Sequence, residues 1–136
     1  MSNIEQTLSI IKPDAIERNL QEQIKSEFKN NGFEILKEKK IHISKEEAEK
    51  FYKVHESKPF YNDLCAYLSS GAIVVMCLQR ENAVSENRKL MGATNPDNAD
   101  EGTLRKKYGI SIDKNSVHGS DSVENARIEL DFFFKD

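Results

Sequence analysis

Hydrophobic and polar positions change period along the chain, and the changes predict strands that alternate with helices. Residues 7–11 are a short run of β-favouring residues that Pro13 interrupts, which is typical of a strand. Apolar side chains then recur every fourth residue from Leu20 to Phe28, as on one face of a helix, and Gly32 supplies a helix-end signal. The chain therefore begins with a predicted strand followed by an amphipathic helix.

The next part of the chain predicts another strand and then two helices. Residues 33–43 start apolar and end in alternation, which indicates a long and partly exposed strand. Ser44 and Glu47 have the spacing of a capping box, which predicts the start of a helix that reaches Tyr52. A second helix is expected over residues 61–68.

A buried strand, a helix and a long loop follow. Residues 72–78 are continuously apolar, as in a central strand that is buried on both faces. Asn82 is a suitable cap for a helix that reaches Met91. Residues 93–115 are rich in Gly, Asn, Pro and Asp and have little periodicity, and a loop of this length is usually functional or disordered. The functional interpretation is favoured, because the loop contains Arg105 and leads to a last short strand with His118.

The end of the chain predicts a helix. Asp121 and Glu124 stand at capping-box spacing, so the helix is expected to start there. Ile128 and Phe132 fall off its apolar stripe, either as incidental surface residues or as part of a subunit contact, and Glu129 lies at the edge of the stripe. The stripe itself consists of Val123, Ala126, Leu130, Phe133 and Phe134.

This order of elements resembles a ferredoxin-like sandwich, an α+β fold with one four-stranded antiparallel sheet and helices on one face. The length of 136 residues suits one domain that covers residues 1–136 and builds a single active site. A fold of this class does not by itself name a function.

Composition narrows the class of protein. With 32% charged and 38% hydrophobic residues, the chain reads as a soluble globular protein, and a net charge of −3 argues against a broad nucleic-acid-binding face. No apolar run approaches the length of a membrane span and no leader pattern opens the chain, so a cytoplasmic protein without membrane contact is expected. Cys65 and Cys77 belong to no metal-binding pattern, and His42, His55 and His118 are scattered, so no zinc site is expected.

The segment 115–122 holds the most informative chemistry. A neutral imidazole such as that of His118 can attack phosphorus near physiological pH. Gly119, which lacks a Cβ, would let a bulky anion or a backbone approach. Taken alone, a packed or surface histidine before an ordinary helix cap is the commoner situation.

Three cations stand out by position: Lys12 at the end of the first strand, Arg88 near the end of a helix, and Arg105 in the long loop. Each alone is an ordinary surface charge. Together they would hold a polyphosphate, because guanidinium forks match phosphate oxygens and lysine adds a point charge. With Mg²⁺ added, a nucleophile and several cations suffice for phosphoryl transfer.

Residues 115–122, Asn-Ser-Val-His-Gly-Ser-Asp-Ser, closely resemble the signature of nucleoside diphosphate kinases. The resemblance extends over nearly the whole chain, and its blocks occur in the expected order. Further matches are Ile11-Lys12-Pro13-Asp14, Pro59-Phe60-Tyr61, Ser70-Gly71, Arg88, Gly92-Ala93-Thr94-Asn95-Pro96, Gly102-Thr103-Leu104-Arg105 and Glu129.

The resemblance implies that the chain transfers the γ-phosphate of a nucleoside triphosphate, mainly ATP, to a nucleoside diphosphate by a ping-pong mechanism. In the family His118 would be the nucleophile, phosphorylated on Nδ1. Glu129, helped by Ser120, would hold the other ring nitrogen. Lys12 would contact the transferring phosphate and the ribose 3′-hydroxyl, and Tyr52 would hydrogen-bond Lys12.

The nucleotide contacts follow from the same resemblance. The outer phosphates would meet Arg88, Thr94 and Arg105, the 3′-hydroxyl would meet Asn115, and the base would lie between Phe60 and Ile112 with Leu64 nearby. Mg²⁺ would be held mainly by the phosphates, with no ligand expected from protein side chains. Apolar faces accept any base, so little base discrimination is predicted.

The family assembles as homotetramers or homohexamers, and the sequence leaves this choice open. Ala15, Asn19 and Glu101 depart from the residues common in the family, but none is a proposed catalytic position. Three alternative functions stay open. They are a non-catalytic nucleotide-binding scaffold, a phosphohistidine carrier between proteins, and a nucleic-acid-binding regulator that uses Arg105-Lys106-Lys107. Nucleic-acid binding is not expected as the main role, because this is the only compact basic run.

Overall fold

The computed structural model describes residues 4–53, 56–59, 61–110 and 116–134. The sheet strands are β1 (Ile4–Ile11), β2 (Glu34–Ile41), β3 (Ile73–Glu81) and β4 (Val117–Gly119). The helical elements are α1 (Pro13–Glu17), α2 (Gln21–Asn30), α3 (Lys45–Phe51), α4 (Tyr61–Leu68), α5 (Ala83–Met91), the 3₁₀ helix η2 (Pro96–Asn98), α6 (Leu104–Tyr108) and α7 (Val123–Phe134).

The four strands form one sheet in the order β2-β3-β1-β4, and every neighbouring pair is antiparallel. The predicted α+β class, with its ferredoxin-like antiparallel sheet, is therefore confirmed. The short edge strand β4 pairs with β1 so that His118 lies opposite Ile10 and Gly119 lies opposite Ser9. This pairing sets which face of the sheet the histidine side chain takes.

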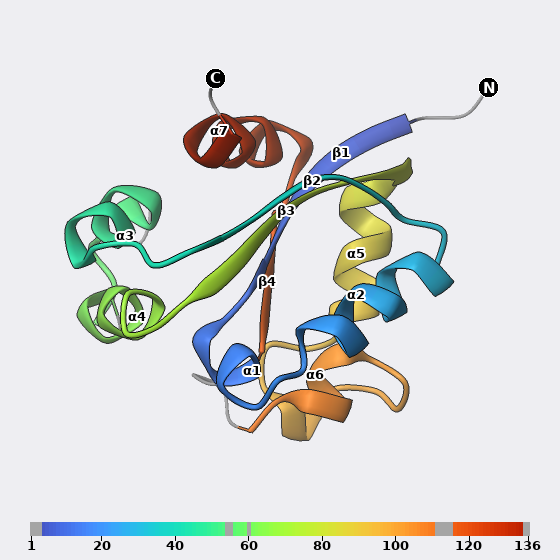
Figure 1. Ribbon diagram of the computed structural model, residues 1–136, viewed down its shortest axis with the longest axis horizontal. Helices are drawn as coiled ribbons and strands as arrows, with labels where there is room; N and C mark the ends of the chain where they lie inside the picture. Colours follow the sequence, from blue (N-terminus) through green and yellow to red (C-terminus); the bar gives the residue numbers. More distant parts are fainter. Residues whose placement is uncertain (1–3, 54–55, 60, 111–115, 135–136) are drawn as a thin grey trace.

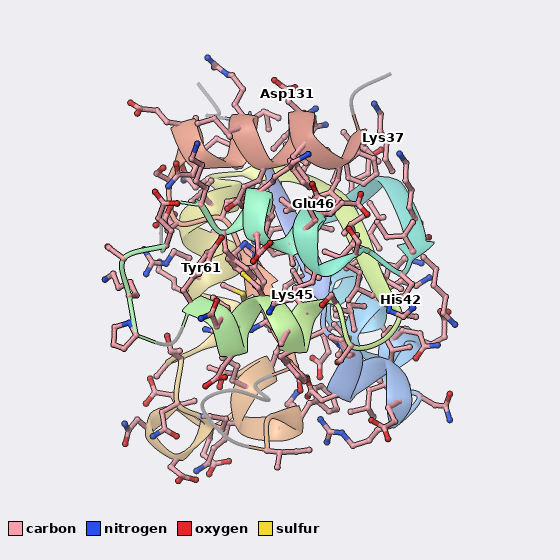
Figure 2. The ribbon with its side chains drawn as sticks, turned by 90° about the vertical axis from the view of Figure 1, so that its left-hand side faces the viewer. Lys37, His42, Lys45, Glu46, Tyr61 and Asp131 are labelled. Atoms are coloured by element: carbon pink, nitrogen blue, oxygen red, sulfur yellow. The ribbon has the colours of Figure 1, made fainter. Side chains whose placement is uncertain are left out.

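Helices cover both faces of the sheet, so the expectation of helices on one face is wrong. Along β3, Ile73 and Val75 belong to the core under α3, α4 and α7, whereas Val74 and Met76 belong to the core under α2, α5 and α6. Figure 1 shows the two sets of helices on opposite sides of the sheet, and Figure 2 looks onto the set formed by α7, α3 and α4. A strand that is apolar at every position needs cover on both faces, because successive side chains point in opposite directions.

Most predicted elements are present with small shifts at their ends. The capping box of α3 is formed by both expected hydrogen bonds, at 3.0 and 3.1 Å between Ser44 and Glu47. At α5, Asn82 stands at the N-cap position, but it is the carboxylate of Glu5 that accepts the N–H of Val84, at 3.2 Å. The reason is that β1 runs beside the start of this helix and brings a stronger acceptor.

The cap of α7 differs from its prediction. Ser122 rather than Asp121 caps the helix, because its Oγ accepts the N–H of Asn125 at 3.1 Å. Asp121 instead accepts the side-chain amide of Asn125. Val123, assigned to the apolar stripe by periodicity, is exposed in the first turn, whereas Ala126, Phe133 and Phe134 are buried as expected.

Two elements lie in the segment that was predicted as a long loop. The short helix α6 starts where Thr103 accepts the N–H of Lys106, and η2 starts where Asn95 accepts the N–H of Asp97. Arg105 is therefore a helical residue rather than a loop residue. Because α6 has only five residues, it has no periodic pattern for the sequence to reveal.

Cys65 and Cys77 are buried and unpaired, in line with the expectation of reduced core cysteines. Within the described ranges, no helix has the length and apolar character that crossing a lipid bilayer would require.

Candidate active site

The side chain of His118 lies on the face of the sheet that α3 and α7 cover. Its cross-strand partner Ile10 points into the same core, and side chains of paired residues share a face. The ring of Phe51, at the end of α3, meets the imidazole edge to face with 5.3 Å between the ring centroids. Phe51 was not among the predicted site residues, although it directly precedes Tyr52, the last residue of the predicted helix.

Glu129, which Ser120 holds in place, binds the imidazole from one side. Nε2 of His118 lies 3.3 Å from Oε1 of Glu129, and Ser120 donates its hydroxyl proton to the same carboxylate oxygen at 2.6 Å. Ser120 is itself fixed, because its fully buried side chain accepts the N–H of Leu8 at 3.3 Å. The histidine side chain retains 20% exposure, so it is oriented by protein on one side and open to solvent in part.

Tyr52 closes the same region from the C-terminal end of α3. Its ring centroid lies 6.2 Å from that of His118, and its side chain is almost fully buried. Burial, and secondarily the negative charge of Glu129, raises the pKa of the Tyr52 phenol above its ordinary range. The phenol therefore keeps its proton and stays neutral, and its oxygen can accept a hydrogen bond from the ammonium of Lys12, as the predicted contact requires.

Lys12 follows β1 directly and occupies the N-cap position of α1, where Pro13 starts the helix. It is only 6% exposed, which is unusual for a lysine. Its N–H donates to the carbonyl of Ser116 at 2.8 Å, two residues before His118. The backbone of Lys12 is thus tied to the chain that enters the histidine strand.

Arg105 is the most unusual charge of the site. It is 9% exposed, and its guanidinium donates to the carbonyls of Gly92 at 3.1 Å and of Val117 at 3.0 Å, while its buried Nε has no partner. In the described part of the chain no carboxylate forms an ion pair with it. Burial, and then the positive charge of Arg88, lowers the pKa of Arg105 to about 10.

Arg88 and Thr94 lie beside Arg105. They line one cavity of about 430 Å³ together with Arg105, and Arg88 is on the exposed face of α5. The remaining lining residues are Ser85, Lys89, Met91, Gly92 and Ala93. The structure therefore brings together the three residues predicted to meet the outer phosphates, in a cavity where positive charge accumulates.

Gly119 is closely packed, but against groups other than those expected. A Cβ at this position would lie 2.4 Å from Nδ2 of Asn87 and 2.7 Å from the methyl carbon of Met91, both on α5. The space beside Gly119 is thus filled by side chains of a helix rather than by an anion or a backbone. At Gly92, where φ is +84°, a Cβ would meet Thr103 at 2.6 Å, so the carbonyl that Arg105 uses also depends on glycine.

The parts of the predicted site that would bind the base and the ribose are mostly outside the described residues. Phe60, Ile112 and Asn115 fall there. Leu64 is described: it lies on α4, is half-buried, and packs against the core under α7 and α3. The structure does not bring Leu64 into the cavity of Arg88 and Arg105.

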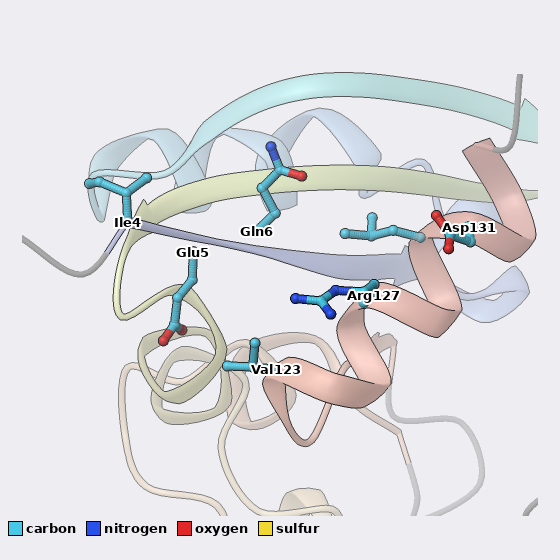
Figure 3. Close-up of a pocket in the computed structure, with 7 residues that line it drawn as sticks. Ile4, Glu5, Gln6, Val123, Arg127 and Asp131 are labelled. Carbon is cyan, nitrogen blue, oxygen red and sulfur yellow. The ribbon is translucent and has the colours of Figure 1, made fainter.

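A second cavity, of about 450 Å³, lies between β1 and α7 and contains none of the predicted site residues. Figure 3 shows its lining, with Ile4, Glu5 and Gln6 from β1 and Val123, Arg127, Leu130 and Asp131 from α7. Its charges have both signs, and Glu5 already caps α5. The cavity of Arg105 is therefore the better anion site although it is slightly smaller.

The arrangement of acidic side chains bears on whether the protein itself could hold a metal ion. Over the residues that the structure describes, no group of three or more His, Cys, Asp or Glu residues is arranged to hold a metal ion. Glu129, the carboxylate nearest to His118, is engaged by the imidazole and by Ser120.

Comparisons with known proteins agree with this geometry. The family model for nucleoside diphosphate kinase matches residues 5–136. A nucleoside diphosphate kinase of Rhizorhabdus wittichii is 56% identical over 131 residues, which cover 96% of this chain and 94% of that protein. One of Geobacter sulfurreducens is 54% identical and covers 96% of each chain.

Solved structures show the same similarity in three dimensions. The nucleoside diphosphate kinase of Aquifex aeolicus has a TM-score of 0.95 and 36% identity, over 96% of this chain and 95% of that one. The enzyme of Encephalitozoon cuniculi, in an apo crystal form, has a TM-score of 0.94 and 39% identity, over 97% and 90% of the two chains. Because sequence and fold agree over nearly the full length, including the segment with His118, the chain belongs to the nucleoside diphosphate kinase family of nucleotide-binding phosphotransferases.

Proposed function

We propose that this family member carries phosphate on Nδ1 of His118 between two nucleotides. The lone pair of Nδ1 attacks the γ-phosphorus of a nucleoside triphosphate, mainly ATP, and the bond to the β-phosphate oxygen breaks as the diphosphate leaves. A second diphosphate then attacks the phosphohistidine with its terminal phosphate oxygen, and the N–P bond breaks. The observation that carries this proposal is the pairing of Nε2 with Glu129 at 3.3 Å, which turns Nδ1 away from the carboxylate.

The cationic cavity supports the same reaction. Arg105 is a buried cation whose hydrogen-bond partners are carbonyl groups. Because none of the described carboxylates neutralises its charge, an anion that enters the cavity is attracted to it. We assign the outer phosphates to Arg88, Thr94 and Arg105. Lys12 is assigned to the transferring phosphate and the ribose 3′-hydroxyl, with Asn115 as a second ribose contact. The positive charge is present before the nucleotide binds, so little reorganisation is needed during transfer.

Mg²⁺ fits this site as part of the substrate rather than as a protein-bound ion. The charged side chains that line the cavity are cations, and Glu129 is occupied by His118 and Ser120, so phosphate oxygens would supply the ligands. When bound, the ion neutralises charge on the phosphates and orients them.

The base site is proposed to be unselective. Phe60 and Ile112 would sandwich the base, with Leu64 nearby, and such apolar faces match every base. Turnover with adenine, guanine, cytosine and uracil diphosphates should therefore be similar. Differences of several powers of ten between the bases would contradict this assignment.

We infer that the working assembly is a homotetramer or homohexamer in the cytoplasm. Ile128 and Phe132, at 66% and 38% exposure, leave apolar surface on α7 that a second copy would cover. Sedimentation of the purified protein measures this directly, and a monomer at micromolar concentration would contradict it.

The experiment that tests the carrier is incubation with γ-labelled ATP and Mg²⁺, followed by trapping of the phosphoprotein. We expect a base-stable, acid-labile label in the wild type and none in His118→Ala. His42→Ala is a matched control, because His42 is an exposed histidine whose Nε2 lies 2.7 Å from the carbonyl of Ser69, on the face seen in Figure 2. A label that survives in His118→Ala, or that is lost in His42→Ala, would refute the assignment.

A further inference from the structure

Asp14 is a buried carboxylate that the proposed phosphate transfer does not use. It lies in the first turn of α1 and is 5% exposed. Its Oδ1 accepts the hydroxyl proton of Tyr67, on α4. Its Oδ2 accepts from Nη2 of Arg18 at 3.0 Å and from Oγ of Ser116 at 3.1 Å. One carboxylate therefore joins α1, α4 and the segment that enters β4.

Tyr67 holds this carboxylate from two directions. Its Oη also accepts the N–H of Asp14, at 2.9 Å. Burial, and then the hydrogen bond to Asp14, raises the pKa of Tyr67 well above its ordinary range, so the phenol stays protonated and continues to donate. The position of Asp14 is thus set by α4 as well as by its own helix.

Ser116 connects Asp14 to the catalytic segment. It is fully buried, and its φ of +76° lies in the left-handed region, which is unfavourable for a non-glycine residue. Its carbonyl accepts the N–H of Lys12 at 2.8 Å, and the chain continues through Val117 to His118. Such a conformation persists only where neighbouring contacts determine it, and Asp14 provides one of them.

The hydrogen bonds around Oδ2 of Asp14 and Oγ of Ser116 suit a group at position 14 that only accepts. Arg18 donates to this Oγ at 3.2 Å, and the Ser116 hydroxyl proton can go to Asp14 or to the carbonyl of Tyr108, 2.9 Å away. A carboxylate only accepts, so it satisfies both Arg18 and Ser116 at once. An amide at position 14 whose oxygen still accepted from Tyr67 would turn its NH2 group toward both of these donors.

Stability alone gives a weak reason for this arrangement. The ion pair between Asp14 and Arg18 takes a carboxylate with 4% side-chain exposure out of water, and such desolvation offsets most of the attraction. Apolar residues of similar volume often serve a fold equally well. The specific result of the charge is a fixed position for Ser116, between Lys12 and His118.

We propose that Asp14 is a positioning residue for phosphate transfer: by fixing Ser116, it sets Lys12 and His118 relative to each other. This rests on the proposed function, in which Lys12 contacts the phosphate that His118 accepts. Asp14 touches neither substrate nor the reacting atoms, and it acts through Ser116 alone.

The first test measures single-turnover phosphorylation of His118 by ATP in Asp14→Ala and Asp14→Asn. We expect the rate to fall about 10²-fold in Asp14→Ala, because small displacements of reacting groups have effects of this size. Asp14→Asn should be intermediate, since its amide oxygen still accepts from Tyr67. The ATP concentration for half-maximal rate should stay nearly unchanged, because no nucleotide contact is removed. Glu22→Gln, which removes an exposed carboxylate paired with Lys25 at 3.0 Å, is the control.

Amide hydrogen exchange provides a readout that is independent of chemistry. We expect the Lys12 N–H to exchange faster in both Asp14 variants and in Tyr67→Phe, while the N–H of Val75 in the central strand keeps its protection. A general loss of stability would accelerate both amides together. Tyr67→Phe loses only one hydroxyl, so it carries the same test if Asp14→Ala does not fold.

Unchanged phosphorylation in folded Asp14→Ala would overturn the proposal, and so would equal acceleration of the Lys12 and Val75 amides. If the wild type forms no phosphohistidine at all, the proposed function fails. Faster exchange at the Lys12 amide but not at the Val75 amide would then still support Asp14 as the residue that fixes Ser116. Equal acceleration at both amides would refute this role as well.

Discussion

Glu129 and Arg105 are both largely buried close to the His118 strand, yet their charges are satisfied differently. Glu129 accepts from Ser120 and faces Nε2 of His118, so its charge is met by groups of this chain. Arg105 has carbonyl partners and no ion pair among the described residues. The nucleophile region is therefore complete without ligand, whereas the cation region is built for an anion that arrives with the substrate.

The largest effect is expected from removing the unmatched cation. Arg105→Met should lower kcat/KM by about 10²–10³-fold, because a preorganised charge on the phosphates is lost. Steady-state kinetics with ATP measures this. Arg88→Met is the matched control, and its effect should be smaller because Arg88 is exposed and screened by solvent.

The same variant also tests the anion site without turnover. ADP with Mg²⁺ should raise the melting temperature of the wild type and raise that of Arg105→Met much less, since at a fixed ligand concentration a weaker ligand stabilises the folded state less. Equal thermal shifts in the two proteins would show that Arg105 does not contribute to anion binding.

Glu129→Gln should affect chemistry and spare binding. A hydrogen bond to a charged acceptor is worth about 1.5–3 kcal/mol, so phosphohistidine formation should slow by roughly 10–10²-fold. The affinity for ADP, measured by calorimetry, should remain that of the wild type. The control is Glu124→Gln, which changes an exposed carboxylate on the same helix. It should leave both the rate of phosphohistidine formation and the affinity for ADP unchanged. If ADP binding weakened in Glu129→Gln, the two regions would not be separable.

Ser120→Ala is expected to act mainly on stability. Removing Oγ leaves the buried N–H of Leu8 without its side-chain acceptor, which costs about 1–3 kcal/mol of unfolding free energy. Urea denaturation measures this loss. Ser85→Ala removes a hydroxyl that contacts the carbonyl of Asn82 in an exposed setting, and it should cost far less. Equal losses would mean that Ser120 does not brace Glu129 against β1.

The smallest effect concerns Tyr52 at high pH. Its pKa is raised on folding, so the folded protein keeps a phenol proton that the unfolded chain loses above pH 10. Stability is therefore unaffected by this group below pH 10 and falls as pH rises above it. Tyr52→Phe should lose about 1 kcal/mol less than the wild type between pH 10 and 11. An identical loss in both proteins would show that the Tyr52 environment does not favour the neutral phenol.

The parts of the fold that the sequence predicted correctly have strong local signals. The continuous apolar run became β3, and the Ser44–Glu47 spacing became a real capping box. The helix α6 was missed because five residues are too few for periodicity. The cover on both sheet faces was missed too, although the pattern of residues 72–78 already required it.

The site, like the fold, contains residues that the sequence predicted and residues that it did not. Local chemistry predicted a poised imidazole near cations, and the resemblance to the family supplied the partners of His118. The burial of Arg105 was not predictable, because arginine is ordinarily a surface residue and only the packing of α6 encloses it. Asp14 was missed as well, because its partners Tyr67 and Ser116 are distant in sequence.

The contact between Gly119 and Asn87 links two positions that are 32 residues apart in the chain. A Cβ at position 119 would also meet the side chain of Met91, so among related chains it becomes acceptable only where the side chains at positions 87 and 91 both make room or α5 has shifted. A substitution at position 119 should therefore be accompanied by changes on α5. A glycine beside the histidine, which reads as part of a catalytic signature, is thus also constrained by the helix that packs against it.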